Sequence, residues 1–200
     1  MKNILKSLTC IMVLFLSSCD TETTGNVSSV TNYPVFEYND FAVIEKGSTF
    51  SGGATATEGG ADLPVTVTSN LDVDNPGVYD VTYSAVNSDG FTANVNQTVV
   101  VYDPSIIASD VTGCYHDTGR PERVGCITLV EGTTNIFLAS DFGFGGTFPV
   151  YFMMDGDTIL EIPQTYAFGQ SSVALTYDPV DGIFTTDISP AGFSYTFQYD

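Results

Sequence analysis

The sequence predicts an all-β fold, in which a β-sandwich is followed by an antiparallel β-meander that forms a second sandwich or a barrel. Residues 79–85 and 91–101 alternate apolar and polar side chains, the period of two that a strand with one buried face requires. Short apolar runs separated by Gly, Pro, Asn and Asp recur along the chain. Val, Thr, Tyr and Phe, which favour strands, are abundant, and amphipathic helical periodicity is absent.

Residues 1–18 are predicted to be a lipoprotein signal peptide. Lys2 and Lys6 accompany a short apolar run over residues 8–16, which is too short to span a membrane. The run ends at Leu16-Ser17-Ser18-Cys19, which resembles a bacterial lipobox. The resemblance implies cleavage before Cys19 and attachment of lipid to its sulfur. An ordinary secretory peptide with an incidental cysteine is the alternative.

Residues 19–32 are predicted to form a flexible tether, because they are polar and lack periodicity. Asp20 and Glu22 follow the cysteine at once and resemble the surface-export signal of Bacteroidetes-type lipoproteins. That resemblance implies a lipid anchor in the outer membrane and exposure at the cell surface. In other Gram-negative bacteria an Asp here signals retention in the inner membrane, which leaves that alternative open.

The charge of the chain excludes some partners. The full sequence has 5 basic and 24 acidic residues, a net charge of −19. Removal of Lys2 and Lys6 with the signal peptide leaves 3 basic and 24 acidic residues, a net charge of −21. Such a chain repels nucleic-acid phosphates and anionic lipid headgroups, so we expect no nucleic-acid partner. Solubility at a cell surface is the simplest role for this charge.

Residues 33–103 are predicted to form the first domain. Short strands are expected at 34–36, 41–44 and 63–69, before the hairpin of residues 79–101. The hairpin turns at Asn87-Ser88-Asp89-Gly90, where Asp-Gly tolerates the positive φ that a tight turn needs.

The first domain also carries a family resemblance. Its segments IEKG (44–47), GATA (53–56), LPVTV (63–67), PGVYDVTY (76–83) and NSDG (87–90) are similar to bacterial immunoglobulin-like domains of the hyalin-repeat and crystal-toxin type. The resemblance implies an immunoglobulin-like β-sandwich without the Cys-Trp-Cys core of antibody domains. Such domains serve as spacers or interaction platforms, and the family supplies no catalytic residues.

Residues 72–77, which read DVDNPG, contain carboxylate and amide oxygens of the kind that bind calcium. An EF-hand loop that starts at Asp72 would need an oxygen ligand at Pro76 and a Glu at Tyr83, so the motif fails. A plain turn is the expected structure, with a looser calcium site at the rim as the alternative. No metal ion or other cofactor is expected.

Residues 104–200 are predicted to form the second domain, because Asp103-Pro104 limits continuation of the preceding strand. Eight strands are expected, separated by Gly-containing turns and arranged as an antiparallel meander. Their expected ranges are 111–116, 124–131, 134–140, 148–154, 158–163, 173–178, 182–188 and 193–199.

The second domain resembles the C-terminal β-domain of Bacteroidetes surface lipoproteins, on the segments GCY (113–115), GCITL (125–129), 136–142 and 183–199. Such lipoproteins are often encoded beside starch-utilisation-type outer-membrane importers. The resemblance therefore implies importer proteins as partners and a glycan or peptide as ligand.

Cys114 and Cys126 remain as a pair once Cys10 leaves with the signal peptide and Cys19 takes lipid. Their midpoint is residue 120, beside Pro121, so in a hairpin turning there they would lie opposite each other. We expect a disulfide that closes this hairpin, in an exported and oxidising setting.

Catalytic chemistry is not expected. His116 and Cys114 share a strand face, but a disulfide explains Cys114 better than a nucleophile–base pair or a metal site. Asp155 and Asp157 flank Gly156 and are expected to form a hairpin turn rather than a glycosidase pair. The sequence contains no nucleophile elbow, P-loop or dinucleotide fingerprint.

The aromatic loop at residues 141–149 is the candidate ligand-binding segment. Phe142, Phe144, Phe148 and the following Tyr151 could cover a ligand, because aromatic faces stack on sugars and apolar groups. The alternative, which we favour, is that these Phe side chains plug an open barrel end. In addition, Asp157-Thr158-Ile159 is similar to the Bacteroidetes O-glycosylation motif, which would modify Thr158.

The sequence as a whole predicts a non-enzymatic cell-surface lipoprotein. Its expected role is that of an accessory ligand-binding component of an outer-membrane importer of glycans or oligopeptides. The alternative is a structural or adhesive surface protein, such as a pilus or matrix component.

Overall fold

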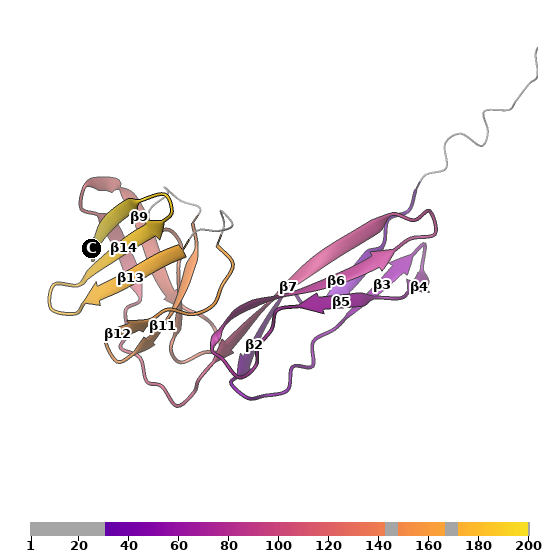
Figure 1. Ribbon diagram of the computed structural model, residues 1–200, viewed down its shortest axis with the longest axis horizontal. Coiled ribbons are helices and arrows are strands. Elements are labelled where there is room, and N and C mark those ends of the chain that lie inside the picture. Colours follow the sequence, from indigo (N-terminus) through magenta and orange to yellow (C-terminus); the bar gives the residue numbers. More distant parts are fainter. Residues whose placement is uncertain (1–30, 143–147, 167–171, 200) are drawn as a thin grey trace, which may run out of the picture. The chain divides into compact units, whose positions relative to one another are not determined.

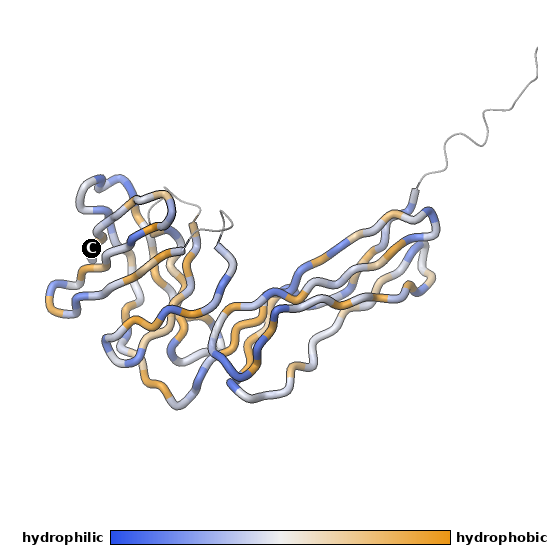
Figure 2. The backbone as a smooth tube through the Cα atoms, viewed as in Figure 1, coloured by the Kyte–Doolittle hydropathy of each residue, from blue (hydrophilic) through white to orange (hydrophobic). Residues whose placement is uncertain are grey.

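The first lobe, residues 33–102, is built around the hairpin of β6 (Gly77–Val86) and β7 (Thr92–Tyr102). The computed structural model describes residues 31–142, 148–166 and 172–199. Along β6 the buried side chains of Tyr79, Val81 and Tyr83 alternate with half-buried polar ones, as predicted. Figure 2 shows the matching alternation of hydrophobic and hydrophilic residues along the strands.

Two sheets form this lobe, one in the order β2-β7-β6-β5 and one in the order β1-β3-β4 (Figure 1). β2 runs parallel to β7, and the other pairs are antiparallel. The remaining strands are β1 (Val35–Tyr38), β2 (Phe41–Glu45), β3 (Ala54–Glu58), β4 (Ala61–Leu63) and β5 (Thr66–Ser69). The predicted immunoglobulin-like sandwich is thereby confirmed in its two-layered all-β form.

The predicted strand 63–69 is wrong in one respect. It is broken at Pro64-Val65, and its two halves, β4 and β5, belong to different sheets. Pro64 has no N–H to donate to a ladder, so the chain can leave one sheet there and enter the other.

The turn between β6 and β7 has the predicted chemistry. Gly90 has a φ of 85°, and its N–H donates to the carbonyl of Asn87. The Asn87 side-chain oxygen accepts the N–H of Phe91 at 2.7 Å. Asn and Gly therefore fix the hairpin register, because each supplies the conformation or acceptor that the turn requires.

The second lobe, residues 113–199, is one antiparallel sheet of eight strands that curls into a nearly closed barrel. The strand order is β12-β11-β10-β9-β8-β15-β14-β13, so β12 and β13 are the two edges. The strands are β8 (Gly113–Asp117), β9 (Arg120–Leu129), β10 (Ile136–Ala139), β11 (Val150–Asp155), β12 (Thr158–Leu160), β13 (Ser172–Asp178), β14 (Ile183–Ser189) and β15 (Phe193–Tyr199). The predicted all-antiparallel sheet is confirmed, and of the two predicted forms, sandwich or barrel, it takes the barrel-like one. It is not a single meander, because β13 follows β12 in the chain but β15 pairs with β8.

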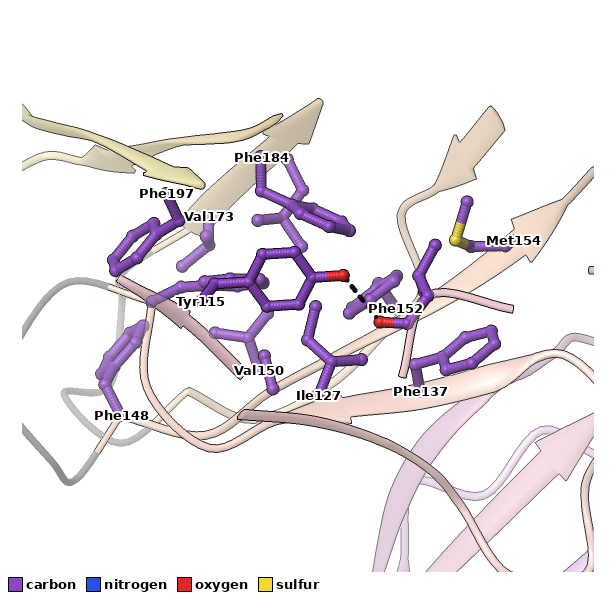
Figure 3. Packing of buried hydrophobic residues seen from close by; sticks show 14 of the residues in the cluster. Tyr115, Ile127, Phe137, Phe148, Val150, Phe152, Met154, Val173, Phe184 and Phe197 are labelled. Atoms are coloured by element: carbon purple, nitrogen blue, oxygen red, sulfur yellow. Dashed lines mark hydrogen bonds between the residues drawn. The ribbon is translucent and has the colours of Figure 1, made fainter. Parts of the chain in front are cut away.

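Aromatic and aliphatic side chains fill the barrel (Figure 3). Tyr115, on β8, packs edge-on against Phe184, with ring centroids 4.9 Å apart. Its hydroxyl donates to the carbonyl of Val111 at 2.8 Å, and burial raises the pKa of this phenol. The described part of the barrel interior is therefore packed with side chains.

A disulfide joins β8 to β9, as predicted, between Cys114 and Cys126. The two residues are direct partners in the ladder, with Cα atoms 4.0 Å apart. The hairpin turns at Thr118-Gly119 rather than beside Pro121, because a bulge at His116/Asp117 shifts the register near the turn. Pro121 therefore lies within β9 and not in the loop.

Reduction of this disulfide is expected to lower the free energy of unfolding by about 3 kcal/mol, the chain-entropy value for a short closed loop. Urea denaturation with and without dithiothreitol measures the change. A Cys114→Ser/Cys126→Ser variant should match the reduced protein and should not respond to the reductant. Equal midpoints for oxidised and reduced wild-type protein would contradict a stabilising role.

The two lobes share a hydrophobic cluster. Val78 and Val100 of the first lobe pack with Ile136 and Ile162 of the second. The N–H of Val78 donates to the carbonyl of Pro163 at 2.8 Å. Residues Tyr33–Asp200 accordingly form one compact unit.

The segment between β7 and β8 is held by contacts with both lobes. The Asn135 side-chain amide donates to the carbonyl of Asp103 at 2.6 Å, and Lys46 approaches the Asp103 carboxylate at 3.4 Å. Hydrogen bonds from Ser105, helped by Lys46, lower the pKa of Asp103.

In the described ranges, no helix is long and apolar enough to cross a membrane.

Candidate ligand-binding cleft

Both lobes line a cleft of about 620 Å³, which we call the junction cleft. One wall is the segment between β5 and β6 together with the start of β6. The other wall is β11, the end of β12 and the residues after it. The lining residues are Asn70, Asp72, Asn75, Pro76 and Tyr79 on the first wall, and Met153 with residues 160–163 on the second.

Hydrogen bonds hold the first wall in shape. The Asp72 carboxylate accepts the N–H of Asp74 at 3.0 Å and the side-chain amide of Asn75. The Tyr79 hydroxyl donates to the carbonyl of Asn75 at 2.9 Å, and the Asn70 side-chain oxygen accepts the N–H of Asp80. Burial, and then the negative charge of Asp72, raise the pKa of Tyr79. This wall is therefore preorganised by its own polar groups.

The second wall is fixed to the first. The bond from Val78 to Pro163 fastens the segment after β12 to the start of β6. The Thr165 hydroxyl donates to the Asp80 carboxylate at 2.8 Å. Ile162 and Met153 are buried in the shared cluster, so this wall offers an apolar floor.

The chemistry of the junction cleft favours neutral or cationic ligands. The side chains at its mouth are the exposed Asn70, Asp72, Asn75 and Glu161, which supply amide and carboxylate groups. None of the lining residues is a cation, so a phosphate or carboxylate on a ligand would meet only negative charge. The lining also lacks His, Cys, Ser and Lys, which nucleophilic catalysis would use.

The aromatic loop predicted from the sequence lies elsewhere. Phe142 and Phe148 are each 0% exposed and pack in the barrel core. Their rings have no free face for a ligand, so they adopt the alternative arrangement, in which they fill the barrel. Phe144 lies outside the described residues.

Tyr151 and Thr158, the other two predicted site residues described by the structure, lie on β11 and β12 outside the barrel core. Tyr151 is half-buried against the shared cluster, and the Gln164 side chain forms two hydrogen bonds with its backbone. Burial raises the pKa of the Tyr151 phenol. Thr158 is exposed at the start of β12, where a modifying enzyme could reach it, and its glycosylation stays a prediction. Cys19 lies outside the described residues.

The other residues that could take part in catalysis or metal binding lie in a disulfide or beside a turn. Cys114 is bonded to Cys126 and has no thiol to offer His116. Asp155 pairs with Thr158 across the β11–β12 turn, where Gly156 has a φ of 54°. Within residues 31–142, 148–166 and 172–199, no group of three or more His, Cys, Asp or Glu side chains could hold a metal ion.

The sequence does not predict the junction cleft, because its walls come from residues 70–79 and 153–163, which are far apart in the chain. The sequence does show local patterns for the two segments that form the walls. Residues 74–77 are predicted to form a turn and residues 158–163 a strand, although β12 ends at Leu160. Nothing in the sequence of either segment indicates that the two lie next to each other in the fold.

Comparison with known families identifies the first lobe. Residues 38–101 match the family model described as "Bacterial surface protein, Ig-like domain". This match agrees with the resemblance found in the sequence and indicates a bacterial surface protein. No curated protein gives a significant match.

Several solved structures are similar to this chain, and two of them come from named bacterial proteins. A crystal structure of a lipoprotein from Bacteroides thetaiotaomicron is 23% identical, with 82% of this chain and 98% of that chain covered and a TM-score of 0.40. A structure from Clostridium perfringens ZmpB, containing its second CBM51 module with GlcNAc and its INT domains, is 17% identical with a TM-score of 0.33. It is covered over 31% of its length, and this chain over 52%.

Proposed function

Because residues 38–101 form a bacterial surface immunoglobulin-like domain, we propose that this chain is a non-enzymatic surface lipoprotein. It is anchored in the outer membrane through lipid on Cys19. It binds a glycan or an oligopeptide as an accessory of an outer-membrane nutrient importer, and the junction cleft is its ligand site.

The observation that carries the ligand-binding part is the junction cleft itself. Binding sites for small molecules are preformed hollows of a few hundred Å³ with an apolar lining and a few placed polar groups. The cleft has this size, an apolar floor at Met153 and Ile162, and polar groups at its mouth. Its walls are already fixed by hydrogen bonds, so little conformational entropy is lost when a ligand enters.

Calorimetric titration of the purified full-length protein in detergent tests this proposal. The probes are maltohexaose, the pentapeptide Ala-Leu-Lys-Leu-Ala and the pentapeptide Ala-Leu-Glu-Leu-Ala. We expect binding of maltohexaose or the Lys peptide, and at least about tenfold weaker binding of the Glu peptide, because the mouth carries carboxylates. Glu161→Lys should weaken binding of the Lys peptide by about tenfold.

Asp181→Lys is the matched control, since it makes the same charge change at an exposed turn of the second lobe. It should leave binding unchanged. Equal loss in both variants would show a general charge effect and would count against the junction cleft. Failure to recover any importer component with the protein from intact membranes would count against the accessory role.

A structural or adhesive role has one supporting observation. All four residues of the edge strand β5 are exposed, including Val67, and an open edge can pair with another chain. Concentration-dependent polymers of the purified protein, together with no binding of the three probes, would favour this second function.

A further inference from the structure

Exposed apolar side chains gather at one tip of the first lobe. Tyr33 is 59% exposed, Phe91 48% and Val86 49%. The rings of Tyr33 and Phe91 lie 5.9 Å apart, and Val86 and Phe91 flank the β6–β7 turn. We call this group the apolar tip. The turn beneath it is fixed, because Glu58 accepts the N–H and the hydroxyl of Ser88, each at 2.8 Å.

The apolar tip is also where the compact unit begins. Tyr33 is its first residue, and 13 residues separate it from Cys19. The tether predicted from the sequence, as a random coil of that length, would have a root-mean-square span of about 20 Å. A lipid on Cys19 would therefore hold Tyr33, and with it the apolar tip, within a short distance of the bilayer.

We propose that the apolar tip docks on the surface of the lipid bilayer, with Tyr33 and Phe91 at the level of the headgroups. This inference goes beyond ligand binding and rests on the anchor proposed at Cys19. Tyr and other amphipathic aromatic side chains favour this interface, where one end of the ring is apolar and the other wet. The charged neighbours Asp89 and Glu58 are both acidic, so the surface that fits is zwitterionic rather than anionic.

The sequence contains no tryptophan, so one introduced indole is a unique reporter. Phe91→Trp protein, with the lipid on Cys19 verified by mass, is reconstituted in phosphatidylcholine vesicles that contain brominated lipid. We expect its emission to shift to the blue and to fall about twofold relative to unbrominated vesicles, as for an interfacial indole. Adding phosphatidylglycerol should reduce both effects.

Val180→Trp supplies the control, because Val180 is exposed in the β13–β14 turn of the second lobe. Its emission should not change with brominated lipid. Equal quenching of the Phe91→Trp and Val180→Trp proteins would overturn the proposed docking. No quenching of the Phe91→Trp protein would overturn it as well. A blue shift that depends on protein concentration without vesicles would assign the tip to self-association and would overturn it too. Absence of lipid in the mass spectrum would refute the proposed anchor, and this inference with it.

Discussion

Phe142→Ala is expected to lower the free energy of unfolding by about 3–5 kcal/mol, the range for removing a fully buried aromatic ring. Phe142 is 0% exposed, and its ring lies 5.5 Å from that of Phe184 and 5.2 Å from that of Phe197. Its carbonyl also accepts the hydroxyl of the buried Thr186. Because the neighbouring rings belong to a sheet that is nearly closed, they cannot collapse into the space that the ring leaves. Urea denaturation followed by circular dichroism measures the loss.

The same variant separates the two interpretations of the aromatic loop. A ligand-stacking Phe142 would leave stability unchanged and abolish binding of maltohexaose or the Lys peptide. A core Phe142 lowers stability and leaves the affinity of the protein that remains folded unchanged. Phe193→Ala is the control, because this side chain is half exposed at the start of β15 and should cost about 1 kcal/mol or less. A cost below that of Phe193→Ala would contradict the buried position.

The sequence predicted the strands well where one face of a strand meets the core. In β6 the period of two is unbroken from Tyr79 to Ala85, because each inward residue packs in one sandwich. In the second lobe β13 and β14 follow the same rule, and the turn between them contains Gly182, which has a positive φ. Alternation and turn chemistry are local properties, so a single chain displays them.

The end of β7 shows where this local reasoning stops. Val99, Val100, Val101 and Tyr102 are all buried, so both faces of the strand are covered there. Val100 and Tyr102 face the cluster that the second lobe shares, which the sequence of β7 alone does not reveal. The junction cleft and the burial of Phe142 depend in the same way on contacts between distant segments. A tertiary neighbour decides each of them, and periodicity carries no information about that neighbour.

Gly125→Ala is expected to destabilise the protein by about 3 kcal/mol or more, since it overpacks a site bounded by backbone. A Cβ on Gly125 would lie 2.2 Å from the carbonyl oxygen of Asp141, well inside the closest normal approach. The residue is in the middle of β9, opposite Tyr115, and Ser140 donates its N–H to the carbonyl of the adjacent Cys126. Relief of the clash therefore requires β9 and the end of β10 to separate. Thermal and urea denaturation of the variant measure the effect.

Gly119→Ala is the matched control, on the same hairpin and with the same added methyl group. Its Cβ would meet its nearest neighbour, the Asp117 carboxylate, at an ordinary 3.4 Å, so we expect a change within about 0.5 kcal/mol. If both variants unfold at the same urea concentration, β9 does not approach Asp141 as closely as described, and the tight closure of the barrel beside the disulfide would be refuted. If only Gly125→Ala is destabilised, glycine is required at position 125 because the backbone of Asp141 lies so close. The backbone conformation of Gly125 would not explain the effect, since its φ is not among the left-handed values.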